Sequence, residues 1–190
     1  MKKAHEILHA LASGSERRRR FLTPVGLLIV TGLALAIVFG SLFTDDVLAL
    51  PRLLPGAPGS LIGLFLLAVS LPLWGWCIVL FKRARGTPVP FNPPREFVVV
   101  GPYAWTRNPM TIGVFGCLVG LGFLLHSLSM VVLWTPLAFG LHAIAVKRLE
   151  EPELELRFGA RYSEYRQRVP MFVPKSPRRA SKVDSTFARR

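Results

Sequence analysis

Long apolar runs alternate along the chain with short polar segments that are rich in arginine and lysine. Residues 21–43 and 59–81 contain no charged side chain, and a helix of either length spans a hydrocarbon core about 30 Å thick. Residues 109–146 also lack Asp, Glu, Lys and Arg, but that run is too long for one ordinary span, and the polar cluster at 126–129 marks a turn within it. The pattern predicts an all-α, polytopic membrane helical bundle. Its expected spans are about 21–43, 59–81, 110–125 and 128–146.

A charged, aromatic and amphipathic segment follows the last span. Pro152 suits the first turn of a helix, and the apolar residues after it recur at helical spacing. They are Leu154, Phe158, Tyr162, Tyr165 and Val169. The spacing predicts an amphipathic interfacial helix over about 152–168, with its aromatic side toward lipid or toward the transmembrane bundle.

The positive charges set the expected orientation in the membrane. The formal net charge is +13, and the cations gather in residues 1–20, between the second and third spans, and in residues 175–190. That distribution is typical of cytoplasmic segments, whereas a nucleic-acid-binding protein concentrates its charge on one folded face. We therefore expect both termini in the cytoplasm, at the inner or plasma membrane if the source is bacterial. Membrane lipids are expected partners, nucleic acid is not, and the oligomeric state stays open.

The chain is expected to form one membrane domain over residues 21–174, between basic tails at 1–20 and 175–190. Cys77 and Cys117 both lie inside apolar runs, where a thiol behaves as a small hydrophobic group. The sequence therefore supports neither a disulfide framework nor a metal site.

Polar residues flank the third and fourth spans at one end of the predicted bundle. Because these spans form a hairpin, residues 101–109 and the segment that begins at Lys147 emerge on the same membrane face. Glu150 and Glu151 are adjacent carboxylates a few residues beyond apolar Val146, where charge is costly unless polar or cationic partners are held. The residues expected to meet there are Tyr103, Arg107, Asn108, Arg148, Glu150 and Glu151.

The carboxyl half of the chain carries a set of spaced motifs. Gly101-Pro102-Tyr103 is followed by Arg107-Asn108-Pro109, and Gly120-Leu121-Gly122 lies in the third span. The last motif combines Glu150-Glu151, Leu154, Phe158-Gly159, Tyr162, Tyr165 and Val169-Pro170. Together they resemble the G-P-Y, R-H-P, G-x-G and E-E-x-x-L-x-x-x-F-G-x-x-Y-x-x-Y-x-x-x-V-P patterns of the integral-membrane methyltransferases of isoprenylcysteine carboxyl methyltransferase and phospholipid methyltransferase type. The first two spans add only their hydropathy.

The resemblance implies methyl transfer from S-adenosyl-L-methionine to a lipid-linked or hydrophobic acceptor that enters from the bilayer. The acceptor would be the carboxylate of an isoprenylcysteine-like group or a phospholipid amine. Glu150 or Glu151 would accept from the ribose hydroxyls or the ammonium, Arg107 or Arg148 would pair with the carboxylate, and Tyr103 would pack on the adenine. Arg107, Glu150 and Glu151 are the expected catalytic residues. The other residues expected at the cofactor are Asn108, Pro109, Gly116, Gly120, Gly122 and His142.

Some of these residues also fit a structural role. Gly116 and Gly120 have the small-xxx-small spacing that is common where membrane helices pack together. His142 equally fits a histidine satisfied inside the bundle. The sequence leaves these alternatives open.

Two positions depart from the family pattern. Asn108 stands where a His is most often found, and Thr111 where a Tyr is often found. A carboxylate acceptor is ionised at neutral pH and needs no base, whereas a protonated amine must first lose a proton. The departures favour a carboxylate acceptor, or an amine deprotonated by Glu150 or Glu151.

Two other functions remain open at this point. One is an NADPH-dependent membrane reductase, since sterol reductases resemble this carboxyl-terminal architecture, although a pair of glutamates repels a 2′-phosphate. The other is a non-catalytic membrane scaffold that keeps the fold.

Overall fold

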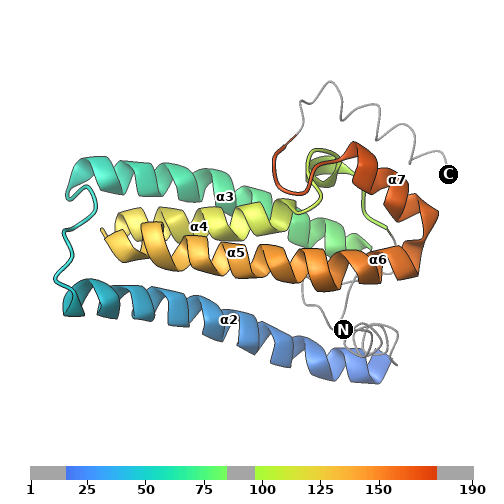
Figure 1. The fold of residues 1–190 in the computed structure, drawn as a ribbon, viewed down its shortest axis with the longest axis horizontal. Coiled ribbons are helices and arrows are strands. Elements are labelled where there is room, and N and C mark those ends of the chain that lie inside the picture. Colours follow the sequence, from blue (N-terminus) through green and yellow to red (C-terminus); the bar gives the residue numbers. More distant parts are fainter. Residues whose placement is uncertain (1–15, 85–96, 175–190) are drawn as a thin grey trace.

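The computed structural model describes residues 16–84 and 97–174, with side chains from residue 24 onward. The described part is a bundle of helices without a strand, which confirms the all-α membrane class (Figure 1). The first helices are α2 (Glu16–Val47), α3 (Ala57–Arg83), the short η1 (Gly101–Ala104) and α4 (Pro109–Leu124). A long fourth helix, Met130–Phe158, combines η2 (Met130–Trp134), α5 (Thr135–Ala145), η3 (Val146–Glu150) and α6 (Glu151–Phe158), and α7 (Ala160–Arg168) follows it.

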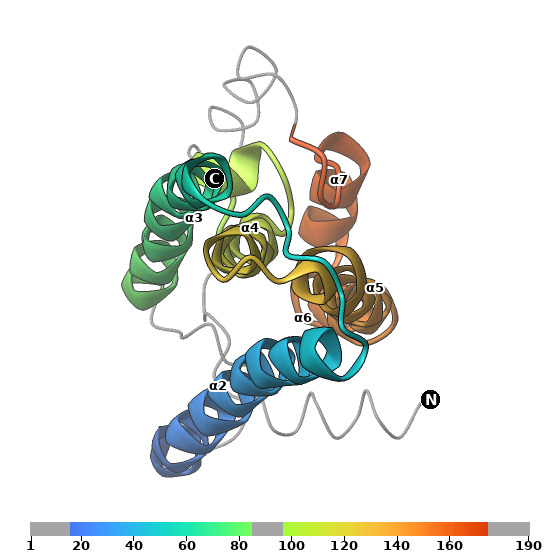
Figure 2. The same ribbon diagram turned by 90° about the vertical axis from the view of Figure 1, so that its left-hand side faces the viewer.

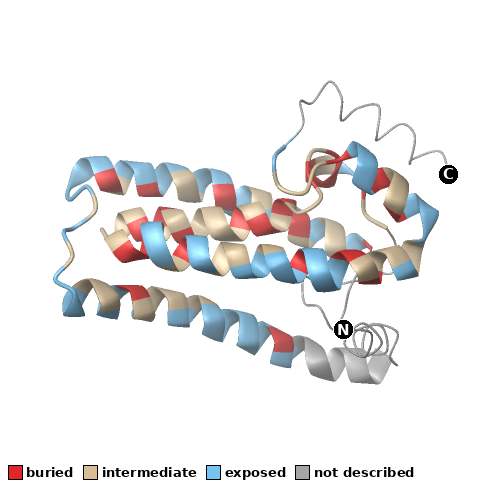
Figure 3. Ribbon diagram, in the orientation of Figure 1, coloured by how far each residue is buried: buried red, intermediate tan, exposed pale blue. Residues whose placement is uncertain are grey.

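Within residues 16–84 and 97–174, three helices are long and apolar enough to cross a membrane: Pro24–Val47, Ala57–Arg83 and Met130–Phe158. The helix α4 is apolar but has 16 residues, and at 1.5 Å per residue it is shorter than a hydrocarbon core of about 30 Å. It lies between α3 and α5 in the end-on view (Figure 2). Buried residues gather along α4, whereas much of α2 and α3 is exposed, as expected of surfaces that contact lipid (Figure 3).

Small residues bring α3 and α4 together. A Cβ added to Gly63 on α3 would lie 2.7 Å from the carbonyl oxygen of Gly120, and one added to Gly116 would lie 2.3 Å from Ser70 Oγ. Membrane helices use small residues in this way because lipid supplies no hydrophobic force between them, so close backbone approach has to stabilise the contact. The structure thus shows Gly116 and Gly120 in the helix-packing role that the sequence had left open.

The turn predicted at 126–129 joins α4 to the fourth helix and is held by Asp45 at the end of α2. The Ser127 hydroxyl donates to Asp45 Oδ2 at 2.5 Å, and the Ser129 amide donates to Oδ1 at 2.9 Å. Close by, Trp134 Nε1 donates to Thr44 Oγ1 at 3.1 Å. These contacts tie α2 to the bundle at the end that carries both the α2–α3 and the α4–η2 connections.

The segment predicted as one helix over 152–168 is two helices. The fourth helix continues through the charged residues to Phe158, and Gly159 then adopts φ +57°, a left-handed conformation that glycine takes without steric cost. The helix α7 therefore turns back over the end of the bundle (Figure 1). Its apolar face, Tyr162 and Tyr165 together with Val169 just beyond the helix, packs with Val99 and against Phe97 rather than facing lipid.

Candidate functional site

An ion pair between Arg107 and Glu151 joins the two segments that the sequence placed on one membrane face. Arg107 Nη1 donates to Glu151 Oε1, across 44 positions of the sequence. The two side chains are only 11% and 5% exposed, respectively. Charges removed from water to this degree need a partner, and each supplies it to the other.

Arg166 on α7 is a second cation at Glu151. Its Nε lies 3.6 Å from Glu151 Oε2, and its Nη1 donates to Glu155 Oε1 at 2.6 Å. Sequence analysis missed this residue, because on one continuous helix over 152–168 it would lie far from Glu151. The signal that could have found it is the Phe158-Gly159 pair, since a glycine at that point allows the chain to reverse.

The segment before α4 is fixed by the chain that follows α7. The backbone amides of Arg107 and Asn108 donate to the carbonyls of Pro170 and Met171 at 2.9 and 3.1 Å. Thr106 Oγ1 and Asn108 Nδ2 also donate to Met171 O, at 2.8 and 3.3 Å. Asn108 stands where the resemblance noted from the motifs most often has a His, and it holds the returning carboxyl-terminal segment. Pro109, at the first position of α4, is buried beneath it.

Tyr103 lies in the same region but is enclosed. Its ring stacks on Phe81 with centroids 5.4 Å apart and planes at 18°, and its carbonyl accepts from the Tyr165 hydroxyl at 2.6 Å. Burial raises the pKa of Tyr103, Tyr162 and Tyr165, because the phenolate would lose its hydration, and the Glu151 carboxylate adds to the effect at Tyr162. All three phenols therefore stay neutral near physiological pH and do not act as bases.

Glu150 and Arg148 differ from Glu151 in being exposed. Among the described residues, the Glu150 carboxylate makes no hydrogen bond, although it interacts electrostatically with the Arg157 guanidinium and with the Glu151 and Glu153 carboxylates, while its neighbour Glu151 is held by two guanidinium groups. The two glutamates are therefore not equivalent. Glu151 holds the site together, and Glu150 presents a carboxylate that can accept hydrogen bonds from something else.

His142 lies on α5, where Nε2 is hydrogen-bonded to Thr111 Oγ1 of α4 at 3.0 Å. Its ring is 5.8 Å from the Phe115 ring. Thr111 is the second departure from the family pattern, and the structure shows that it is the partner of this histidine.

The predicted cofactor glycines make helix contacts in the structure. Gly116 and Gly120 meet α3 as described above, and a Cβ on Gly122 would lie 2.7 Å from a side-chain carbon of Val131. None of these contacts involves Arg107 or Glu151. A role of the glycines at the cofactor stays a prediction.

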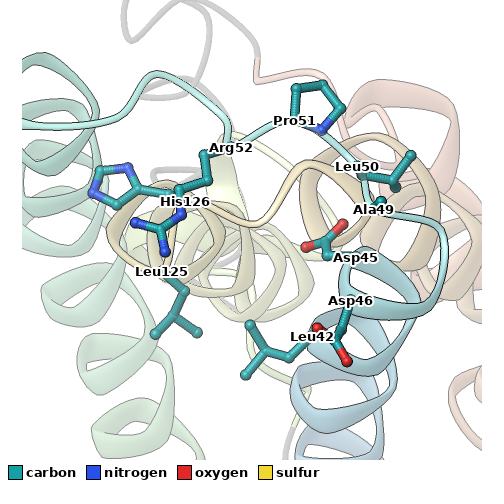
Figure 4. Close-up of a pocket in the computed structure, with 9 residues that line it drawn as sticks. All are labelled: Leu42, Asp45, Asp46, Ala49, Leu50, Pro51, Arg52, Leu125 and His126. Carbon is teal, nitrogen blue, oxygen red and sulfur yellow. The ribbon is translucent and has the colours of Figure 1, made fainter.

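A cavity of ≈ 560 Å³ lies at the opposite end of the bundle (Figure 4). It includes Asp45, Asp46, Arg52 and His126 in its lining. Asp45 is engaged by the α4–η2 turn, and His126 Nδ1 lies 3.1 Å from the Leu53 carbonyl. In the described ranges, no group of three or more His, Cys, Asp or Glu side chains gathers as metal ligands do.

The apolar helices define an integral membrane protein. Its buried ion pair, between Arg107 and Glu151, lies at one end of the hairpin that α4 forms with the fourth helix. Residues 60–161, more than half of the chain, match the phospholipid methyltransferase family, and the chain belongs to it. This confirms the resemblance stated from the motifs.

Two curated relatives are named for metal resistance. The chain is 30% identical over 118 residues to the nickel-cobalt-cadmium resistance protein NccN of Alcaligenes xylosoxydans xylosoxydans. That alignment covers 61% of this chain and 51% of that protein. It is 29% identical over 149 residues to the cobalt-zinc-cadmium resistance protein CzcN of Cupriavidus metallidurans. That alignment covers 77% of this chain and 61% of that protein. The matches thus span between half and two thirds of those relatives. No solved structure matches the chain.

Proposed function

We propose that this protein transfers a methyl group from S-adenosyl-L-methionine to a lipid-linked or hydrophobic acceptor at the membrane interface. Family membership supports methyltransferase activity. The observation that carries the proposal is the Arg107–Glu151 ion pair, because it joins the segment that contains Arg107 to the segment that contains Glu150 and Glu151.

The chemistry of the donor set fits this cofactor, whose bound form supplies a methyl group on an electrophilic sulfonium. The Glu150 carboxylate, which makes no hydrogen bond among the described residues, accepts from the ribose hydroxyls or the ammonium, and the guanidinium of the exposed residue Arg148 pairs with the carboxylate of the cofactor. Arg107 Nε is buried without a hydrogen-bond partner, so the site retains one donor that a bound polar group satisfies. Glu151 acts through Arg107, whose orientation it fixes.

The membrane arrangement fits an acceptor that arrives from the bilayer. Exposed cations surround this end of the bundle, with Lys82 and Arg83 at the end of α3 and Lys147 and Arg148 on η3. By the excess of cations we assign this end to the cytoplasmic side. An acceptor anchored by an apolar chain reaches the site along the exposed apolar surface of α5, which includes Leu137, Leu141 and Ile144.

Calorimetric titration of the detergent-purified full chain with S-adenosylhomocysteine tests the proposal. Saturable binding is expected, and Glu150→Gln should weaken it at least tenfold, about 1.4 kcal/mol. Glu164→Gln is the matched control, since Glu164 is a surface glutamate on α7 that is paired with Arg168.

The same titration separates the alternatives. Binding of NADPH in place of S-adenosylhomocysteine would indicate the reductase. Folded protein that binds neither cofactor would indicate the scaffold. Because the two named relatives are resistance proteins for cobalt and cadmium, growth of a deletion strain on these metals is the cellular phenotype to score.

A further inference from the structure

The cavity at the end of the bundle away from Arg107 is lined by both charged and apolar side chains (Figure 4). Its volume is ≈ 560 Å³, and its lining comes from the end of α2, the α2–α3 loop and the α4–η2 turn. The α4 helix, 16 residues long, separates it from the candidate site by about 24 Å along the axis. A ligand of this cavity is therefore not a reactant at the candidate site.

Asp46 and Arg52 bring opposite charges to the cavity without pairing with each other. Both residues are exposed, and neither side chain makes a hydrogen bond or an ion pair among the described residues. In Figure 4 the Arg52 guanidinium lies apart from the Asp46 carboxylate, which belongs to the last turn of α2. Asp45 differs, because its carboxylate accepts from Ser127 and Ser129. The cavity thus presents one cation and one anion that each lack a partner in this part of the protein.

His126 adds a hydrogen-bond acceptor to the cavity. Its Nδ1 lies 3.1 Å from the Leu53 carbonyl oxygen, and a carbonyl only accepts, so Nδ1 carries the proton of the neutral ring. The Nε2 atom then carries the lone pair, and it has no hydrogen-bond partner among the described residues. The Leu53 amide in turn donates to the His126 carbonyl at 2.9 Å, so the two residues hold each other. A fixed ring thus leaves one nitrogen able to accept from a ligand.

Residues in an unfavourable backbone conformation lie around the cavity. Ala49 and His126 line it and have φ of +46° and +53°, and Leu54 in the α2–α3 loop has φ of +40°. Residues with a Cβ rarely adopt this left-handed region, and those that do concentrate at functional sites such as ligand clamps. Among the described residues other than glycine, these three are the ones with positive φ, and all belong to the connections at this end. The strain therefore indicates a role for this end beyond joining helices.

The cavity lies at the depth of lipid headgroups. The apolar span Pro24–Val47 ends beside it, and the span Ala57–Arg83 begins just after the loop that lines it. Leu42 on α2 and Leu125 after α4 are exposed apolar residues of the same lining. Where helices leave the hydrocarbon core, they are surrounded by headgroups and by the first carbons of the acyl chains. A ligand that suits this depth has both a polar head and an apolar tail.

We propose that this cavity binds the headgroup of an aminophospholipid as a structural ligand, in the leaflet opposite to that of the candidate site. The ammonium group donates to the Asp46 carboxylate and to His126 Nε2, and the phosphate pairs with the Arg52 guanidinium. The acyl chains leave past Leu42 along the exposed apolar surface of α2. This inference does not depend on the proposed methyl transfer, because none of these residues belongs to the candidate site.

The charges of the lining favour a zwitterion over a metal ion or a simple anion. A metal ion would leave the Arg52 guanidinium unpaired beside a second cation, and a simple anion would leave the Asp46 carboxylate unpaired beside a second anion. The described residues also contain no group of three metal-ligating side chains. A choline headgroup has no N–H bond, so it cannot donate to Asp46 or His126. A primary ammonium linked to a phosphate matches both charges and the acceptor.

A bound lipid would connect α2 more firmly with the rest of the bundle. In the described structure the contacts of α2 are concentrated at η2, where Trp134 donates to Thr44. The proposed ligand adds a second connection, from Asp46 on α2 to Arg52 in the loop and His126 in the turn. We therefore expect the lipid to raise the thermal stability of the protein.

The experiment uses the full chain, purified in detergent and freed of lipid, to which one lipid at a time is returned. Native mass spectrometry measures binding, and thermal unfolding measures stabilisation. Dioleoylphosphatidylethanolamine should bind about tenfold or more tightly than dioleoylphosphatidylcholine or dioleoylphosphatidylglycerol, and it should raise Tm to a plateau. Asp46→Asn and Arg52→Gln should each weaken its binding by about tenfold or more, because each removes one charge-assisted contact.

Matched changes at the other end of the bundle serve as controls. Glu164→Gln and Arg161→Gln alter surface residues of α7 and should bind phosphatidylethanolamine as the wild type does. Without lipid, Asp46→Asn and Arg52→Gln should melt as the wild type does, since neither side chain has a partner among the described residues. Lipid bound elsewhere on the bundle is the part of the signal that these two variants do not change.

Four results would each overturn the inference. The wild type could bind the three lipids equally well, or Asp46→Asn and Arg52→Gln could bind phosphatidylethanolamine as tightly as the wild type. Glycerophosphoethanolamine, which lacks acyl chains, could compete with the lipid at equal concentration, which would indicate a site for a soluble ligand. Mn²⁺ alone could raise Tm in a way that Asp46→Asn abolishes, which would indicate a cation site. None of these results bears on S-adenosylhomocysteine binding, which tests the proposed function separately.

Discussion

Glu151→Gln is expected to destabilise the end of the bundle that contains the candidate site, because it removes the negative charge that compensates the Arg107 guanidinium. The Arg107 side chain is 11% exposed and that of Glu151 is 5% exposed, so the guanidinium would be left buried beside a neutral amide. Breaking one partner of such a buried pair costs about 3–5 kcal/mol. For a chain of this size, that corresponds to a fall in Tm of roughly 6–20 °C.

The second cation at Glu151 gives the matched comparison. The Arg166 side chain is 42% exposed, and its contacts with Glu151 and Glu155 are screened by water. Arg166→Gln should therefore cost only about 0–1 kcal/mol. A double variant, Arg107→Met with Glu151→Leu, replaces both charges by apolar groups of similar size, so it should be more stable than Glu151→Gln alone.

Thermal unfolding in detergent micelles, followed by far-ultraviolet circular dichroism, measures all four proteins. The reasoning would be refuted if Glu151→Gln melted within about 2 °C of the wild type, a loss under about 1 kcal/mol. It would also be refuted if the double variant were no more stable than Glu151→Gln alone. Either result would mean that the Arg107–Glu151 pair is hydrated rather than buried.

Three further predictions concern other parts of the molecule. Gly63→Ala should lower the free energy of unfolding by about 1–3 kcal/mol, because its Cβ would lie 2.7 Å from a carbonyl oxygen of α4. Gly75→Ala in the same helix meets open space and should raise the free energy of unfolding by up to about 1 kcal/mol. Thermal melts of the two variants measure the difference. Asp45→Ala removes the acceptor that holds the α4–η2 turn and should cost about 1–3 kcal/mol, while the exposed Asp46→Ala should change little; equal rates of limited proteolysis at the turn would contradict this. The pKa of each of the three tyrosines is higher in the folded than in the unfolded chain, so their contribution to stability is complete below about pH 10 and is lost as the pH rises further; near-ultraviolet titration should show phenolate only as the protein unfolds in alkali.

The apolar pattern was sufficient to predict the bundle, because a membrane restricts uncharged runs of this length to helices. The turn near His126 and the meeting of the Arg107 and Glu151 segments also followed from the pattern, since a hairpin of two spans returns the chain to the face it left. Helical periodicity could not show the break at Gly159. The apolar positions before and after it continue the same spacing, so the reversal of α7 depends on one backbone conformation.

The site was predicted less completely, because the sequence does not show which side chains contact one another there. The sequence placed Glu150 and Glu151 together as equivalent carboxylates. The structure separates them, because Arg166 reaches Glu151 only after the chain has turned at Gly159. Tyr103 was expected to pack on a cofactor ring, yet one face of its own ring lies on Phe81, a residue of α3 that no motif contains. Contacts between distant segments decide both cases, and local spacing carries no information about them.

The packing of α4 on one side determines which residues it presents on the other. Gly113, Gly116 and Gly120 recur at steps of three and four and lie against α3. Thr111 and Phe115 lie four residues apart on α4 and meet the fourth helix at His142 and Phe139. Because glycines let α3 approach so closely, α4 is fixed in rotation about its axis, and this rotation directs Thr111 toward His142. A larger side chain at Gly116 would therefore rotate or displace α4, and would weaken the Thr111–His142 contact together with the helix packing.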